Sequence, residues 1–234
     1  MFKRQLQQLH SQKNQAGFTI IESLVAVIVL GILMTAIAPT IVLSTATRVQ
    51  SRRIELATLA ARGYIDGVSS GNIPAPPISK TKTNDVKVPG TSLSCNNKDL
   101  KKNKGYCSSP KDDSSYRVYC VDGTADGECT KEESKDFIVQ AFGYNEFSTT
   151  ASSGYKLSVR VYRADAFDTS KDSSPLEKSD EKKKATQSAF TGGLGKRKAP
   201  LVEITTEITA TGETTFKSYC SRLNNSSNTN SDCD

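Results

Sequence analysis

The chain has 234 residues, of which 36% are hydrophobic and 24% charged, and its formal net charge is +6. Nineteen of the 26 positions at 18–43 are apolar, so the rest of the chain is poor in core-forming residues, which argues against a large two-domain enzyme. His10 is the single histidine, which argues against histidine-based acid–base catalysis in a later domain. The sequence therefore predicts that the protein is not an enzyme.

Residues 1–17 are short, basic and polar, and they end in Gly17. Three basic residues and no acidic one lie in this segment, so the other residues are only mildly basic and nucleic acid is not an expected partner. An apolar run follows at 18–43, and its uncharged part at 24–43 would span about 30 Å as a helix, the thickness of a bilayer core. We predict a leader at 1–17 and a transmembrane helix at 18–43.

Three kinds of N-terminal segment could have this pattern. A cleaved secretory signal has a shorter apolar stretch before its small-residue site, and here Pro39 directly follows the small residues. A plain signal anchor accounts for the length and for the basic residues on the cytoplasmic side. It gives no reason for Glu22, because a carboxylate at the edge of an apolar run is costly unless it is paired.

The string Gly17-Phe18-Thr19-Ile20-Ile21-Glu22 resembles the prepilin processing motif of type IV pilins and type II secretion pseudopilins. The resemblance implies that prepilin peptidase cleaves after Gly17 and methylates the new amino terminus on Phe18. It also implies that Glu22 pairs with the amino terminus of a neighbouring subunit during assembly. Gly31 and Pro39 fall where pilins have a flexible glycine and a helix-bending proline. The chain would then be a structural subunit that passes from the membrane into a filament core.

The same resemblance implies the partners and the location. The partners would be prepilin peptidase, other pilin or pseudopilin subunits, and the membrane platform with its assembly ATPase. Before assembly the chain would cross the inner (plasma) membrane once, with the leader in the cytoplasm and the head outside. After assembly it would lie in a cell-surface or periplasmic filament.

A narrower resemblance runs from Gly17 to about Pro77, and it is carried by residues 46–68. This stretch is similar to the stalk of the hormogonium polysaccharide secretion pseudopilins of filamentous cyanobacteria. It implies a minor subunit that serves secretion, with polysaccharide as the exported material, and motility. Two alternatives stay open: a minor pilin for adhesion or DNA uptake, and a membrane-anchored binding module that does not polymerise.

Residues 44–70 are predicted to continue the helix as a stalk, because they contain good helix formers and no proline. Apolar residues recur there at three- and four-residue spacing, as expected for a stripe that packs on a globular head. The stripe consists of Ile54, Ala57, Ala61, Ile65 and Val68. The small polar residues at 69–72 are predicted to end the helix.

Residues 71–234 are predicted to form a β-rich head outside the cytoplasm. Strands are expected at 116–121, 137–142, 155–162, 201–208 and 214–219, where β-branched and aromatic residues gather. The second and third of these are expected to pair antiparallel. The predicted fold class is α+β, with the C-terminal half of the long helix packed on a small, disulfide-stapled antiparallel sheet. Residues 168–200, rich in charges, serine and glycine, are expected to form a flexible loop.

Six cysteines lie in the polar part of the chain, and their even number favours disulfides in an oxidising compartment. Zinc is the competing interpretation, but the chain has no C-x-x-C pair and no histidine near the cysteines. Six cysteines allow fifteen connectivities, and short loops favour the local one. The local pairs are Cys95–Cys107, Cys120–Cys129 and Cys220–Cys233.

One segment partly matches a calcium-binding loop. Asp122, Thr124, Asp126 and Glu133 fall at positions 1, 3, 5 and 12 of the template, with threonine in place of an acidic or amide side chain. The flanking segments are expected to be strands, so we favour an acidic turn pinned by two cysteines. The sequence predicts no cofactor, with calcium as the alternative. The lysine clusters at 101–104, 182–184 and 196–198 are expected to be solvated loop faces.

Overall fold

The computed structural model describes residues 17–108, 114–170, 172–189 and 196–209. The chain divides into two compact units, residues 1–44 and 45–234, and each is described by itself. Helix α1 (Ile20–Ser69) passes through both of them and continues through Pro39 without a break in its helical assignment. In the first unit every described side chain from residue 17 to 44 is exposed, as expected for a segment whose partners lie outside the chain.

Hydroxyl groups in the apolar part of α1 form hydrogen bonds within the helix. Ser23, Thr35 and Thr40 each donate to the carbonyl oxygen three residues earlier, at 2.8, 2.9 and 2.7 Å. Such bonds matter in hydrocarbon, where an unpaired polar group costs several kcal/mol. Within residues 18–43 Glu22 is the only charged side chain. Helix α1 is long and apolar enough to cross a membrane.

The second unit is built around one sheet. Its strands are β1 (Ile78–Ser79), β2 (Arg117–Val121), β3 (Phe137–Tyr144), β4 (Tyr155–Arg163) and β5 (Val202–Ile208). The antiparallel pairs are β2–β3, β3–β4 and β4–β5, and the pairing of 137–142 with 155–162 is confirmed. The short elements are α2 (Asn97–Lys102), η1 (Ala151–Ser153) and η2 (Ala164–Phe167).

The expectation of a purely antiparallel sheet is wrong at one edge. Ile78 and Ser79 pair in parallel with Gly143 and Tyr144, on the same side of β3 as β2. The linker after α1 bonds back to the helix end through the Ile73 N–H and the Gly67 carbonyl (2.9 Å), and the Pro77 carbonyl then accepts the Gly143 N–H (2.8 Å) at the start of the parallel pairing. The sheet is therefore mixed, while the α+β class is confirmed.

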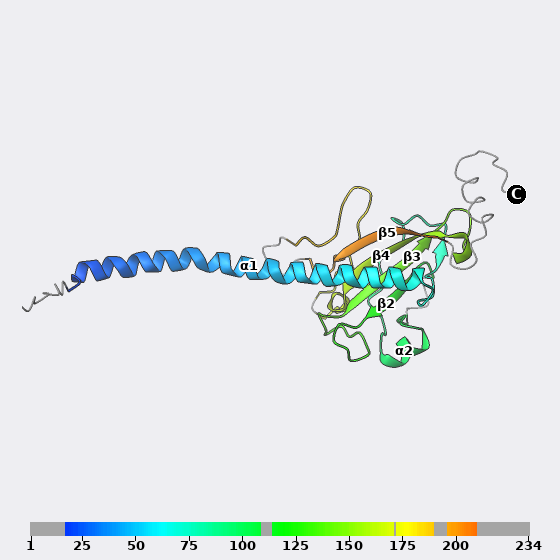
Figure 1. Ribbon diagram of the computed structural model, residues 1–234, viewed down its shortest axis with the longest axis horizontal. Coiled ribbons are helices and arrows are strands. Elements are labelled where there is room, and N and C mark those ends of the chain that lie inside the picture. Colours follow the sequence, from blue (N-terminus) through cyan, green and yellow to red (C-terminus); the bar gives the residue numbers. More distant parts are fainter. Residues whose placement is uncertain (1–16, 109–113, 171, 190–195, 210–234) are drawn as a thin grey trace, which may run out of the picture. The chain divides into compact units, whose positions relative to one another are not determined.

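Figure 1 shows the C-terminal half of α1 lying across one face of the sheet. Alternate residues of the strands face the helix, because side chains of a strand alternate between the two faces. The shared core includes Ala57, Ala61, Tyr64 and Val68 from α1, with Val139 and Val159 among the strand residues. Ile54 and Ile65 of the predicted stripe are only partly buried at its margins.

The opposite face of the sheet is covered by loops instead of a helix. Ile138, Phe142 and Tyr162 pack there with Val86 and Leu176. Leu176 belongs to the segment 168–200, whose described residues contain neither helix nor strand. Its flexibility stays a prediction, since its described part also buries Ala185, Gln187 and Ala199.

Two disulfides close the loops on that second face. They join Cys95 to Cys107 and Cys120 to Cys129, as in the local pairing. All four cysteines belong to the second core cluster. Cys220 and Cys233 lie outside the described residues, as does the predicted strand at 214–219.

Candidate functional site: the helix start and the surfaces of the head

The first turn of α1 begins at the predicted processing site. Gly17, Phe18 and Thr19 precede the helix, which begins at Ile20. Thr19 acts as the N-cap, because its Oγ1 accepts the backbone N–H of Glu22 at 3.3 Å. The Thr19 carbonyl also accepts the N–H of Ser23 at 3.1 Å, the first turn of the helical ladder.

Glu22 therefore lies in the first helical turn, where backbone N–H groups give the helix end a partial positive charge that favours a carboxylate. The spacing Thr-x-x-Glu before an apolar run is a capping-box signature, which the sequence analysis missed although the signal was present. Phe18 is 83% exposed at the end of this turn. The geometry thus presents the Gly17–Phe18 bond outside the helix, where an enzyme can reach it.

The two other predicted assembly residues lie further along the same helix. No described atom comes within 4 Å of a Cβ built on Gly31, so its surface is open. Pro39 lies inside the helix and has no N–H for the ladder, so it removes one helical hydrogen bond. Their roles in assembly stay predictions.

The calcium-loop candidates form a hydrogen-bonded turn after β2. Asp122 Oδ1 accepts the N–H groups of Thr124 (2.9 Å) and Ala125 (2.6 Å), and Oδ2 accepts that of Gly127 (2.7 Å). Burial alone would raise the pKa of Asp122, but the hydrogen bonds outweigh it and lower the pKa below its ordinary value. Asp122 thus works as the acceptor that shapes the turn.

Of the other members of the template, Thr124 bonds to Asp122 directly. Its hydroxyl donates to Asp122 and to Asp136, whereas Asp126 accepts the nearby N–H of Glu128 (3.0 Å). Within the described residues no group of three histidine, cysteine or acidic side chains is placed to hold a metal. The buried carboxylate beside the turn is Asp136, which sequence analysis did not single out; it accepts from Gly123 (3.1 Å) and Thr130 (3.2 Å).

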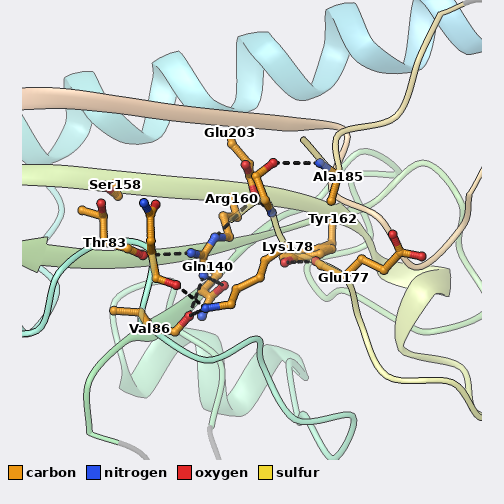
Figure 2. A network of polar contacts seen from close by, with 12 residues as sticks. Thr83, Val86, Gln140, Ser158, Arg160, Tyr162, Glu177, Lys178, Ala185 and Glu203 are labelled. Carbon is orange, nitrogen blue, oxygen red and sulfur yellow. Dashed lines mark hydrogen bonds and ion pairs between the residues drawn. The ribbon is translucent and has the colours of Figure 1, made fainter. Parts of the chain in front are cut away.

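A charged network lies on the sheet face away from α1 (Figure 2). Arg160 of β4 is 4% exposed, and its guanidinium donates to the carbonyls of Thr83 (3.0 Å) and Val86 (3.1 Å). It also donates to Gln140 Oε1 at 3.2 Å and lies 3.4 Å from Glu203. The network therefore ties residues 83–86 to the three neighbouring strands β3, β4 and β5.

A second set of bonds ties residues 177–179 to the same place. Lys178 Nζ donates to the carbonyl oxygens of Asn84 and Val86, the latter at 3.0 Å. Tyr162 Oη donates to the Glu177 carbonyl at 2.8 Å, and Glu203 accepts from the Ser179 N–H at 3.1 Å. These donors and acceptors serve other parts of the chain, so the network fixes loops onto the sheet.

Comparison with known families gives one finding. Residues 12–38 match the family model described as the prokaryotic N-terminal methylation motif, and no curated protein or solved structure matches the chain. The matched residues include the processing string, the N-cap and most of the apolar helix. The head lies outside the match. The N-terminal segment is thus similar to that of type IV pilin-like prepilins, which points to a processed, membrane-anchored structural subunit that assembles with other pilins.

Proposed function

We propose that the protein is a minor pilin-like structural subunit, a pseudopilin, that is cleaved after Gly17 and methylated on Phe18. It then assembles through α1 into a pilus or pseudopilus. Before assembly it crosses the plasma membrane once, with residues 1–17 in the cytoplasm and the head outside. The membrane platform and the assembly ATPase drive its transfer into the filament.

The observation that carries this proposal is the position of Glu22. It is the only charge in a 26-residue segment, it lies in the first helical turn, and it follows the cleavable Gly17–Phe18 bond by four residues. The hydroxyl groups of the segment are already bonded within the helix, whereas a carboxylate needs a cation in an apolar environment. A new amino terminus on Phe18 of a neighbouring subunit supplies that cation.

Two further observations support the location of the head. Its two disulfides are typical of proteins folded in oxidising compartments. The basic residues of the segment 1–17 favour its retention on the cytoplasmic side. A single membrane-spanning helix between a cytoplasmic segment 1–17 and an external head is the simplest arrangement that agrees with both observations.

The cleavage step is tested with Gly17→Val in the full chain. We expect the variant to keep residues 1–17 and to stay in the membrane fraction, as measured by mass spectrometry of its N-terminus. Gly31→Ala, a glycine substitution within the same helix, serves as the control and should be cleaved normally. If Gly17→Val has the same N-terminus and the same membrane fractionation as the wild type, the prepilin interpretation is refuted.

The assembly step is tested with Glu22→Ala and Glu22→Gln. Both variants should be cleaved, yet both should be depleted at least several-fold from sheared filaments, because an uncharged side chain cannot pair with an amino terminus. Normal recovery of either variant would show that the carboxylate has another role. The alternative of a membrane-anchored module that does not polymerise would instead be supported if the wild-type chain were absent from sheared filaments.

We propose secretion and motility as the cellular role, with polysaccharide as the exported material, on the basis of the stalk resemblance at 46–68. Deleting the gene should lower secreted polysaccharide and gliding while leaving DNA uptake and surface adhesion unchanged. Loss of DNA uptake or adhesion alone would instead favour the alternative of a minor pilin for those functions. The deletion strain is then complemented with Glu22→Ala, which should be cleaved but depleted from filaments. A phenotype that this variant does not restore depends on assembly.

A further inference from the structure

An apolar groove runs along α1 in the unit 45–234. Its volume is about 630 Å³, and the wall on the helix side consists of Leu56, Leu59, Ala60, Gly63 and Tyr64. The opposite wall is formed by β2, the turn that follows it, and the start of β3 at Phe137. Leu59 is 56% exposed, so the groove leaves large apolar surface in water. Surface of this kind marks an interaction site when it is contiguous.

Gly63 keeps this groove open. It lies in the interior of α1, where glycine is less favourable than any residue except proline. A Cβ built on it meets no described atom within 4 Å, so packing within the unit does not require glycine there. By contrast, a Cβ on Gly67 would lie 2.5 Å from the side chain of Ile73. An occupant that approaches the helix closely would account for the glycine at 63.

Among the described residues of the same unit, one exposed aromatic side chain could fill such a groove. Phe147 lies in the connection between β3 and β4 and is 49% exposed. Among the described residues of this unit, the only other exposed large apolar side chains are on α1: Val49, Leu56 and Leu59. Aromatic side chains that insert into apolar pockets contribute strongly to protein interfaces.

Hydrogen bonds hold Phe147 in its exposed position. The side chain of Asn145 is buried, and its Oδ1 accepts the N–H groups of Phe147 (2.8 Å) and Ser148 (3.1 Å). Its Nδ2 donates to the Gly154 carbonyl at 2.7 Å, across the loop. The hydroxyls of Thr150 and Ser148 add a contact at 2.9 Å. A loop that is ordered before binding loses little entropy when it docks.

Phe147 and the groove lie at opposite ends of β3. The groove includes Phe137 at the start of the strand, and Phe147 follows its last residue, Tyr144. Eight strand residues extend over about 23 Å, so Phe147 does not reach the groove of its own unit. A contact between two copies would instead be head-to-tail, and such contacts generate open filaments when they do not close into a ring.

We propose that Phe147 of one copy inserts into the groove beside Gly63 of a second copy. The inference rests on the proposed function, because it supplies a contact between heads in the assembled filament. The contact is heterologous: one copy contributes the braced aromatic loop and the other contributes the groove between α1 and β2. The two surfaces are both apolar, and the described residues of the unit leave both of them uncovered.

The test uses two differently tagged copies of the full chain expressed together. One has Glu146→Cys, at the exposed position next to Phe147, and the other has Gly63→Cys, and covalent dimers are measured in sheared filaments without reducing agent. We expect a mixed dimer when both substitutions are present and none when either is present alone. The matched control replaces Glu146→Cys with Ser152→Cys, an exposed residue of the same loop, and should give at least several-fold less dimer.

A second experiment uses substitutions that block the groove, and it measures filament recovery without cross-linking. Gly63→Leu should fill it and lower filament recovery several-fold, whereas Arg62→Leu adds the same side chain at the neighbouring exposed position and should not. Phe147→Ala should match Gly63→Leu. All three should be cleaved after Gly17 and should unfold near the wild-type temperature, which shows that they fold.

The outcomes separate the two proposals. If the wild-type chain is recovered in filaments but the dimer is absent, or equals the Ser152→Cys control, the contact between Phe147 and the groove is refuted and the proposed function stands. Normal recovery of both Phe147→Ala and Gly63→Leu also refutes the contact. If the wild-type chain is cleaved but never enters filaments, the proposed function is refuted, and the contact that depends on it is refuted with it.

Discussion

The hydroxyl oxygens of Tyr64 and Tyr106 lie 2.7 Å apart, and Tyr106 Oη also lies 2.6 Å from the carbonyl oxygen of Pro74. A carbonyl can only accept, so Tyr106 donates to Pro74 and accepts from Tyr64. These two directed hydrogen bonds join helix α1 to Tyr106, which forms an isolated bridge with Tyr119, and to the linker that leaves the helix. Tyr119 packs against both rings, with centroids 5.2 and 5.4 Å away.

The direction of this chain predicts unequal effects of the two tyrosines. Tyr64→Phe removes one donor and should lower the free energy of unfolding by about 1 kcal/mol. Tyr106→Phe leaves the Pro74 carbonyl without its donor and the Tyr64 hydroxyl without its acceptor, so it should cost about 2–3 kcal/mol. The double variant should resemble Tyr106→Phe. Urea denaturation of the three variants measures this, and equal single effects would contradict the assigned direction.

The buried tyrosines also predict a loss of stability at alkaline pH. Burial raises the pKa of Tyr106 and of Tyr155 to about 12, and it raises those of Tyr64 and Tyr162 as well. A group whose pKa is raised on folding holds its proton more tightly when folded, so its contribution is complete below pH 10. That contribution is lost as the pH rises through 12.

Urea denaturation between pH 9 and pH 12 checks this expectation. The wild-type free energy of unfolding should fall steadily above pH 10, and Tyr106→Phe should show a shallower fall because one titrating group is gone. Lysines titrate in the same range, so the difference between the two proteins is the informative quantity. Identical slopes would mean that Tyr106 ionises as readily in the folded state as in the unfolded state.

Arg160 is expected to be the most sensitive charged residue of the head. Arg160→Met removes the donors to three acceptors and leaves the Glu203 carboxylate beside an apolar side chain, so it should cost about 3–5 kcal/mol. Arg117→Met, an exposed arginine on β2, is the matched control and should cost under about 1 kcal/mol. Because Arg160 binds residues 83–86, limited proteolysis should cut the variant in that loop first. Cutting elsewhere would assign the loss to a different part of the head.

The turn at Asp122 predicts a structural role for its carboxylate. Asp122→Ala removes the acceptor of three N–H groups and should lower stability by about 1–3 kcal/mol. Asp122→Asn keeps one acceptor oxygen and should lose less. Millimolar calcium should not change the unfolding temperature of the wild type. Calorimetric heat of calcium binding that disappears in Asp122→Asn would instead support the metal site.

Much of the head could be predicted because its strands obey simple patterns. β3 and β4 are short apolar runs rich in β-branched and aromatic residues, so their positions and antiparallel pairing followed from the sequence. The two-residue strand β1 could not be found this way, because Ile78 and Ser79 follow Pro77 and are too few to show a period. Their pairing depends on where the helix end places the linker.

The polar residues of the core were not identified from the sequence. Gln140 and Arg160 lie on a buried sheet face, yet in sequence a polar residue within a strand indicates a solvated face. Only the loops that cover this face make those positions buried. Tyr64 was also missed, although it lies seven residues from Ala57 on the buried side of α1. At the helix start Glu22 was predicted from its isolation, while the capping role of Thr19 was overlooked.

The contacts of α1 in the unit 45–234 bear on how the subunit responds to pulling. Gln50 bonds to Gln187 at 2.6 Å near one end, and Tyr64 bonds to Tyr106 fourteen residues later, about 21 Å along the helix. Between them, Ala57 and Ala61 pack on the sheet. A force along the helix axis therefore loads all of these contacts in shear, and they must fail together instead of one after another. When the subunit is pulled by its helix, the head would thus stay folded and attached to α1.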